Sequence, residues 1–338
     1  MPELPEVETV RRSVENAVVG ARITQVEVGR ERTVRRSSKQ ALIAGLHQET
    51  FVAVRRHGKY LLFDLSSGNV MMVHLRMTGQ LLVLPGVAAI DPYIRAILTL
   101  ADGREIRYRD VRALGRLALV ARRDDGAPAV SLDPADDAAL SDHGPEPLEA
   151  TFTVAAFQAM LAPRRGRLKS LLLDQRFLAG LGNIYVDEAL WRAQLHPLAV
   201  AAALRPAEVE RLHAAIVGVL NEAVAARGSS IDDYTGPDGD GSMQERLAVY
   251  QRGGEPCLRC ARPIRRATLG GRGTHYCPHC QPLPRGRRAA GSAATMRGGA
   301  LERRGPRWSE GLQAATVGAT SAERAAARRR AVRSGTGV

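Results

Sequence analysis

The sequence has no uninterrupted apolar run long enough to span a bilayer, which excludes a protein anchored by a transmembrane helix. Its acidic first residues also lack the basic and then apolar pattern of a secretory signal. We therefore expect a cytoplasmic protein with no membrane partner. Cysteine is equally scarce: all four cysteines lie between Cys257 and Cys280, which in a reducing compartment predicts metal binding rather than disulfides.

Basic charge is concentrated at the C-terminal end of the chain. Residues 284–338 carry twelve arginines, no lysine and three acidic residues, a net charge of +9 out of the total of +13. This segment is rich in Arg, Ala and Gly and poor in core-forming residues, so we expect a disordered tail that attracts nucleic acid non-specifically. Residues 1–283 are left with +4, so the high pI says little about the partner of the folded part.

The spacing of apolar residues divides the rest of the chain into two kinds of structure. Residues 21–122 hold short apolar or alternating segments separated by glycine-containing turns, which is typical of a β-sandwich or barrel. After the proline-rich stretch 141–150, apolar residues recur at helical spacing in three segments, the last of which ends at Gly228. The length of 338 residues allows two or three such domains.

The chain begins MPELPEVET, an acidic stretch in a basic protein. A helix explains part of it, because Pro5 suits a first turn and Glu6 and Glu8 complement the helix dipole. Valines continue this helix at the spacing of one buried face, at positions Val7, Val10, Val14 and Val18. A helix does not explain the residues at positions 2 and 3.

Pro2 becomes the N-terminus if Met1 is removed, and it then presents a secondary amine. An α-amino group titrates near pH ~8, against ~10.4 for lysine, so at cellular pH it is partly neutral and nucleophilic. Such an amine forms an iminium with a sugar aldehyde carbon, and the adjacent Glu3 is placed to shuttle protons. Small tautomerases also use an N-terminal proline, but they are short chains without zinc, so the length and the four cysteines argue against that class.

The cysteines form two Cys-x2-Cys pairs separated by sixteen residues, at Cys257, Cys260, Cys277 and Cys280. This spacing predicts a tetrahedral zinc site that is structural, because four thiolates leave no open coordination position. A redox pair or a chance arrangement is the alternative. The gap suits a β-hairpin whose GGRG tip offers Arg272 to a partner, and we interpret the nearby His275 and His279 as non-ligands.

Three other candidate sites are ambiguous from the residues alone. In AGLGN, Gly180 and Gly182 allow a tight double turn, after which either Asn183 caps the next helix or the helix start holds a phosphate. Lys59 leads into an apolar strand, where a solvated lysine is ordinary. His74 lies within an apolar strand, where a packed histidine is more common than a catalytic one.

Taken together, six segments resemble the formamidopyrimidine-DNA glycosylases, a family of bifunctional base-excision repair enzymes. They are MPELPEVETVRR, RRHGKYLLF, HLRMTGQ, RYRDVR, LDQRFLAGLGNIYVDE and PCLRC…GRGTHYCPHCQ. The resemblance runs in order over residues 2–282 and implies an α+β fold with one structural zinc per chain. Its parts would be an N-terminal catalytic β-sandwich flanked by helices (1–140), a linker (141–150), a helix–two-turn–helix domain (151–250) with a lesion loop (228–243), a zinc-finger β-hairpin (251–283) and the uncovered tail (284–338).

The resemblance also implies a reaction. The family removes oxidised purines, typically 8-oxoguanine or formamidopyrimidines, from double-stranded DNA after flipping the damaged base. By analogy Pro2 would attack C1′, and the resulting Schiff base would undergo β- and δ-elimination. Glu3 would protonate the sugar oxygen and handle the elimination protons, Glu6 would hold the N-terminus, and Lys59 would complete the catalytic group. We expect a monomer that is associated with the nucleoid through DNA.

Residues that contact DNA follow from the same resemblance. One set would grip the kinked phosphates around the flipped nucleotide, namely Lys59, His74, Asn183, Tyr250 and Arg272. Met77 and Arg112 would fill the hole left in the base stack, with Arg112 on the orphaned base.

Some positions depart from the family pattern. Leu114 stands where a phenylalanine wedge is usual, and it is either the wedge or a residue that packs its loop against the sandwich. Tyr93 and Arg95 replace a usual pair of histidines, with Tyr93 still expected to contact DNA, and Asp232 replaces a basic residue of the lesion loop. These changes leave the chemistry intact and the lesion preference open.

Two alternative functions remain. An endonuclease VIII-like glycosylase would act on oxidised pyrimidines, but PELPE and the glycine-rich loop favour purines. A damage-binding protein would recognise distorted DNA without cutting it, but the intact Pro2, Glu3 and Lys59 argue against that.

Overall fold

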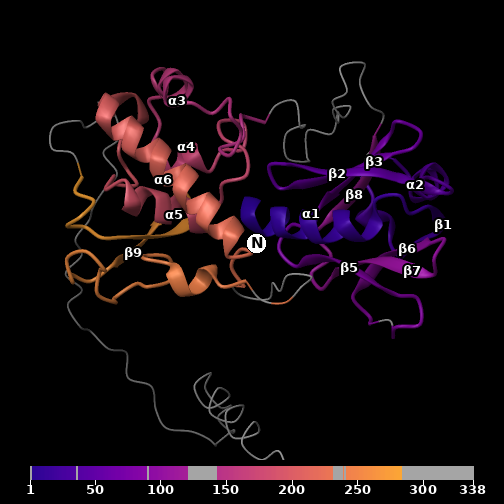
Figure 1. Cartoon of the computed structure of the whole chain (residues 1–338). Coiled ribbons are helices and arrows are strands. Elements are labelled where there is room, and N and C mark those ends of the chain that lie inside the picture. Colours follow the sequence, from indigo (N-terminus) through magenta and orange to yellow (C-terminus); the bar gives the residue numbers. More distant parts are fainter. Residues whose placement is uncertain are drawn as a thin grey trace, which may run out of the picture. The chain divides into compact units, whose positions relative to one another are not determined.

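The computed structural model describes residues 2–35, 37–89, 91–120, 143–230, 239 and 241–283, and these form an α+β fold (Figure 1). The predicted fold class is therefore confirmed. Several predicted segments lie outside the described residues, namely 121–142, most of the lesion loop 228–243 including Asp232, and the tail 284–338. No helix in the described part of the chain is long and apolar enough to cross a membrane.

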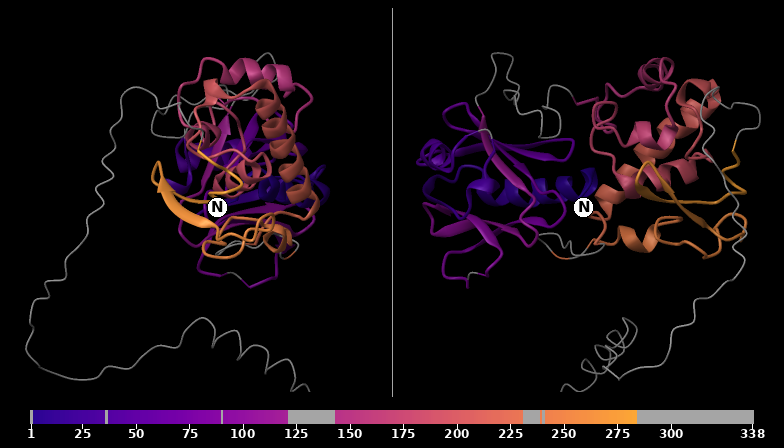
Figure 2. Two further views of the ribbon diagram at one scale, coloured as in Figure 1. Left: turned by 90° about the vertical axis from the view of Figure 1, so that its left-hand side faces the viewer. Right: turned by 180° about the vertical axis from the view of Figure 1, so that it is seen from behind.

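Two four-stranded antiparallel sheets build the N-terminal β-sandwich (Figure 2). The first sheet has the order β1 (Ile23–Val28), β6 (Ile94–Leu100), β7 (Arg104–Asp110) and β5 (Gly79–Pro85). The second has the order β2 (Phe51–His57), β3 (Tyr60–Leu65), β4 (Val70–His74) and β8 (Arg116–Val120). All eight strands lie within residues 21–122, where the sequence predicts a β-sandwich or barrel.

Two helices cover the open sides of this sandwich. Helix α1 (Leu4–Val18) packs against β2 and β5, the strands at one edge of each sheet. Helix α2 (Lys39–Leu46), which Ser38 caps through a hydrogen bond from the N–H of Ala41, packs against β1 and β8 at the opposite edges. Since uncovered strand edges expose unpaired backbone groups, the helices also protect the sandwich. The valine face predicted for α1 lies in the sandwich core.

A second hydrophobic core belongs to four helices: α3 (Val154–Leu161), α4 (Leu168–Leu172), α5 (Asn183–Arg192) and α6 (Pro206–Ala225). Leu4, the first residue of α1, is buried in this core, and its N–H donates to the carbonyl of Gly180 at 3.0 Å. The beginning of α1 is therefore packed among the helices while the rest of it covers the sandwich (Figure 1). Short 3₁₀ turns occur at Glu31–Thr33, Ala201–Ala203 and Met243–Arg246.

The predicted hairpin between the cysteine pairs is confirmed as β9 (Arg265–Leu269) and β10 (Arg272–Tyr276). Leu269 pairs with Arg272, so the connecting turn is Gly270–Gly271. Both glycines have positive φ, 55° and 74°, as the two central residues of a type I′ turn require. The cysteine segment packs against α5 through a third small core that includes Trp191 and Ile264.

Candidate active site

Glu3 links the start of α1 to the start of α5. Its carboxylate accepts hydrogen bonds from the backbone N–H groups of Ile184 at 3.0 Å and Tyr185 at 3.4 Å. Gly182 makes this approach possible, because a Cβ there would lie 2.4 Å from the Glu3 Oε1. A buried carboxylate thus occupies the N-terminus of α5, where the helix dipole and the unpaired N–H groups favour negative charge.

The ionisation of Glu3 is set mainly by burial. Burial, with a smaller contribution from the Glu6 carboxylate, raises the pKa of Glu3 to about 7, against the opposing effects of Lys59 and of the two α5 N–H groups. Lys59 is itself buried, in the turn between β2 and β3. A carboxyl group that titrates near neutral pH can both donate and accept a proton in one reaction cycle.

Glu6 holds the N-terminal segment in place through hydrogen bonds with the start of α1, with α5 and with Ser229. It accepts from the N–H of Glu3 at 2.9 Å and from the hydroxyl of Tyr185 at 2.5 Å. It also accepts from the N–H of Ser229 at 2.7 Å and from its hydroxyl at 3.1 Å. Gly228, with φ of 76°, leaves the room, since a Cβ there would lie 2.8 Å from the Glu6 side chain. Pro2, which is buried, directly precedes this anchored residue 3.

His74 ends β4 beside Tyr60, the residue that follows Lys59. Its Nδ1 accepts the N–H of Arg76 at 3.0 Å, and its ring packs edge-on against Tyr60 with 4.5 Å between centroids. Burial, helped by Arg76 and Lys59, lowers the pKa of His74 well below its ordinary value. The ring is therefore neutral with its proton on Nε2, a tautomer that can donate to an anionic oxygen.

A second group of predicted residues lies at one corner of the sandwich, on the loops that follow β4 and β7. Asp110 organises this corner: it accepts from the Thr78 hydroxyl at 2.5 Å and from the N–H of Gly115 at 2.7 Å. Thr78 in turn accepts the N–H of Arg112 at 3.1 Å. The loop backbone is thus fixed while its side chains remain on the surface.

Those side chains are exposed. Met77 and Leu114 are each 38% exposed, and Arg112 places its Nη1 3.3 Å from the sulfur of Met77. Part of the Leu114 side chain is therefore accessible at the surface, as insertion into a base step would require. Tyr93, 40% exposed, joins this corner because its carbonyl accepts the N–H of Asp110 at 2.9 Å.

A third group is assembled by α5. Asn183 is the first residue of this helix and not its cap, so the capping prediction is wrong. Its Nδ2 instead donates to the carbonyl of Gly273 in β10 at 2.8 Å, next to the exposed Arg272. At the start of α5, Glu3 accepts the N–H groups of Ile184 and Tyr185, so these two groups are not open to a phosphate.

Tyr250 is positioned from the same helix. The buried carboxylate of Glu188 accepts the backbone N–H groups of Ala248, Val249 and Tyr250 at 2.8 to 2.9 Å. Sequence reasoning missed Glu188, as it missed Tyr185 and Ser229. The available signal was a pair of adjacent acidic residues, at positions 187 and 188, within an otherwise apolar helix segment.

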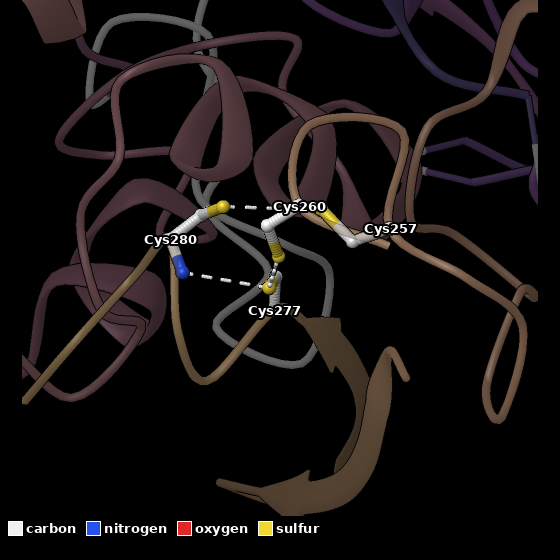
Figure 3. A group of neighbouring side chains, drawn as sticks. All are labelled: Cys257, Cys260, Cys277 and Cys280. Atoms are coloured by element: carbon white, nitrogen blue, oxygen red, sulfur yellow. Dashed lines mark hydrogen bonds between the residues drawn. The ribbon is translucent and has the colours of Figure 1, made fainter. Parts of the chain in front are cut away.

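The four cysteines converge as predicted (Figure 3). Their sulfur atoms all lie within 4.8 Å of one another, with Cys257 to Cys280 at 3.9 Å and Cys260 to Cys277 at 3.5 Å. A tetrahedral site with Zn–S bonds of ~2.3 Å has edges of ~3.8 Å, so this donor set fits one structural zinc. These distances exclude disulfides, which need ~2.05 Å.

The surroundings of Cys257 favour its thiolate form. The indole N–H of Trp191, on α5, donates to its sulfur at 3.4 Å. Burial raises the pKa of the Cys257 thiol, but hydrogen bonds from backbone groups and from Trp191 outweigh it and lower the pKa to about 6. A thiolate is the form that binds zinc.

Three family models match this chain in the order of its folded parts. Residues 1–117 match the formamidopyrimidine-DNA glycosylase N-terminal domain, and residues 143–235 match the H2TH domain of the same enzymes. Residues 254–283 match the zinc finger found in FPG and IleRS. The chain is also 43% identical over 287 residues to the formamidopyrimidine-DNA glycosylase of Symbiobacterium thermophilum, an alignment that covers 85% of this chain and 91% of the relative.

Solved structures give the same result. The MutM (Fpg) protein of Thermus thermophilus superposes with a TM-score of 0.72 at 41% identity, covering 83% of this chain and 98% of that one. Wild-type Lactococcus lactis Fpg bound to DNA containing N7-benzyl-Fapy-dG superposes with a TM-score of 0.73 at 34% identity, covering 83% and 100%. A complex of Lactococcus lactis Fpg with DNA containing an abasic site gives a TM-score of 0.73 at 33% identity, with the same coverage.

Proposed function

This chain belongs to the formamidopyrimidine-DNA glycosylase family, and we propose that it is a base-excision repair enzyme with both glycosylase and lyase activity. Its substrate is double-stranded DNA that contains oxidised purines, 8-oxoguanine and formamidopyrimidines. Relatives have been seen with DNA that carries a formamidopyrimidine or an abasic site. One observation carries the proposal: a buried carboxyl group, Glu3, with its pKa raised to about 7, directly follows a proline that can become the N-terminus.

In the proposed reaction, the secondary amine of Pro2 attacks C1′ of the flipped nucleotide after Met1 is removed. The C1′–N bond to the damaged base breaks, and the base leaves with a proton. Protonated Glu3 donates to the ring oxygen of the sugar, which opens the ring and leaves an iminium between C1′ and the proline nitrogen. Glu3 then accepts a proton from C2′, so the 3′ phosphate leaves by β-elimination, and δ-elimination releases the 5′ phosphate.

We also propose roles for the positioned side chains. Lys59, His74, Asn183, Tyr250 and Arg272 contact the phosphates around the flipped nucleotide. In support, Lys59 precedes Tyr60, which pairs with His74, and Lys59 interacts electrostatically with Glu3. Asn183 on α5 binds the carbonyl of Gly273, the residue after Arg272, and Glu188 on α5 binds the N–H of Tyr250. Met77, Arg112, Leu114 and Tyr93 meet the base stack from the exposed corner of the sandwich, with Leu114 as the wedge.

We further infer a monomeric enzyme that acts where the genome lies, associated with the nucleoid through DNA. We infer the domain division 1–140, 151–250 and 251–283, joined by the linker 141–150. One zinc ion, held by Cys257, Cys260, Cys277 and Cys280, supplies structural support to the hairpin, since four thiolates leave it no position for substrate.

A cleavage assay over a panel of duplexes, each with one lesion, tests this function. We expect excision and strand cutting at 8-oxoguanine and formamidopyrimidines, with phosphates left at both ends of the gap. Cutting at oxidised pyrimidines alone would support the endonuclease VIII-like alternative. Tight binding of lesion duplexes without any cutting would support a damage-binding protein instead.

A further inference from the structure

Lysine is rare in this chain, with three residues at Lys39, Lys59 and Lys169. Lys169 lies in α4 with 1% of its surface exposed, and its Nζ is 2.6 Å from Oδ1 of Asp187 in α5. Asp187 is fully buried. None of the residue groups described above includes this ion pair. The Lys169 ammonium nevertheless interacts electrostatically with Glu3 at the start of α1 and with Arg272 in the hairpin.

Both members of the pair bind the backbone of β10. Lys169 Nζ donates to the carbonyl of Gly273 at 3.0 Å, and the same carbonyl accepts from Asn183 at 2.8 Å. Asp187 Oδ2 accepts the N–H of His275 at 2.8 Å. The strand is thus attached to α4 and α5 at residues 273 and 275, on either side of one intervening residue.

The attachment made by Lys169, at Gly273, lies near the tip of the hairpin and next to Arg272, while the one made by Asp187, at His275, lies nearer its base. The cysteines lie at its base, where Cys277 follows the last residue of β10. A zinc ion bound there fixes the base, but a two-stranded ribbon is weakly stable by itself and flexes along its length. Through the bond from Lys169 to Gly273, the ion pair supplies a second anchor one residue away from Arg272.

The chemistry of the pair suits a positioning role better than a stabilising one. A buried ion pair gains little net stability over apolar side chains of similar size, because desolvation of both charges offsets their attraction. The pair instead fixes the position of β10. Each charge is bound to a particular backbone group of this strand, so a shift of the strand would break one of these bonds.

We propose that Lys169 and Asp187 are positioning residues that set the register of β10 against α5 and thereby aim Arg272 at a phosphate of bound DNA. The inference rests on the proposed function, because it takes DNA as the partner of Arg272. Lys169 is too buried to contact a phosphate itself, so its effect on DNA must act through the hairpin.

The test is a double-mutant cycle on the full-length, zinc-loaded protein. Binding to a duplex with a tetrahydrofuran abasic-site analogue is measured over a range of salt concentrations for Lys169→Met, Arg272→Ala and the double variant. Each single change should weaken binding about tenfold, as expected for one lost charge-assisted contact. Each should also lower the slope of log affinity against log salt by about one, and the double variant should equal Arg272→Ala. Lys39→Met, which removes a lysine from α2, should leave the slope unchanged.

Additive losses in the double variant, or a Lys169→Met protein with the slope of the wild type, would overturn the proposal. Zinc content and thermal unfolding are checked for each variant. If Lys169→Met loses zinc, Asp187→Asn carries the test, and if both lose zinc the pair maintains the fold and the proposal is wrong. Failure of the proposed function would appear separately, as a wild-type protein that neither prefers the abasic-site duplex nor cuts lesion DNA.

Discussion

The region proposed for chemistry and the region proposed for base recognition are built in opposite ways. Around Glu3 and Glu6, carboxylates are buried and bound to fixed donors from α5 and from Ser229. At the Asp110 corner, the backbone is held but Met77 and Leu114 are exposed. The first arrangement fixes proton positions at the cost of adaptability. The second leaves side chains free to meet DNA, and the departures Leu114 and Tyr93 both lie there.

The largest expected effect comes from Glu3→Gln. Loss of a general acid and base should slow excision by ~10²- to 10⁴-fold. The same substitution should stabilise the folded protein. Because the folded-state pKa of Glu3, about 7, lies above its ordinary value of 4.5, ionisation of the buried group costs stability as pH rises through 7. Glu3→Gln should therefore raise the free energy of unfolding at pH 8, by up to ~3 kcal/mol, and should raise it less at pH 5.

Glu6→Gln is the matched control for that prediction. Four donors point at the Glu6 carboxylate, and an amide group would oppose one of them with an N–H. We expect a loss of ~1–3 kcal/mol in the free energy of unfolding. Thermal and denaturant unfolding at pH 5 and pH 8 measures this difference between the two variants. If both variants raised the free energy of unfolding, or both lowered it, the prediction would be contradicted.

The next largest effect concerns the zinc site. Cys260→Ser should lose zinc and bind lesion DNA weakly, because the hairpin then loses the anchor at its base. The sandwich has its own core and should stay folded. Metal analysis, circular dichroism and binding assays check this together. A metal-free protein with the DNA affinity of the wild type would show that the zinc does not support the DNA contacts.

The exposed corner should respond more mildly. Leu114→Ala removes apolar bulk that we expect to enter a base step, so excision from duplex should slow while an abasic substrate is spared. Leu114→Phe should hold or improve lesion capture, since stacking on an aromatic ring is worth ~1–3 kcal/mol per base. Neither change should shift the melting temperature much, because Leu114 is exposed. A sharp drop in stability with equal slowing of both substrates would mean that Leu114 serves packing.

The smallest effect should follow removal of residues 285–338. This segment carries much of the net charge, so its loss should reduce salt-sensitive binding to undamaged DNA. Excision at saturating enzyme should hardly change. A folded but inactive truncated protein would show that the tail belongs to the active site.

The sequence predicts local features of this molecule better than its long-range contacts. Helix α1, the helix from Pro206 and the hairpin were predictable because apolar spacing, Pro and Gly–Gly act within a few residues. The N-terminal motif and the resemblance both indicated Glu3 and Glu6, but neither indicated what holds them. Asp187 and Glu188 look like ordinary charged helix residues in the sequence. Only the folded chain places both at zero exposure against backbone groups 60 to 88 residues away.

Asn183 is a position at which a local rule predicts the wrong structure. A polar residue after two glycines fits a helix cap, and local rules favour that interpretation. The cap position is instead Gly182, because the carboxylate of Glu3 needs the space that a side chain would fill. A contact with Glu3, which is distant in the sequence, therefore decides which residue stands at the cap position of α5.

Chemical trapping at the N-terminus tests the central claim most directly. Sodium borohydride is added while the enzyme turns over lesion DNA, and the covalent complex is digested and mapped by mass spectrometry. We expect a reduced adduct on the nitrogen of Pro2, and no trapping in a form shown to retain Met1. An adduct on Lys59 or Lys169, or equal trapping with Met1 in place, would contradict the assignment of Pro2 as the nucleophile.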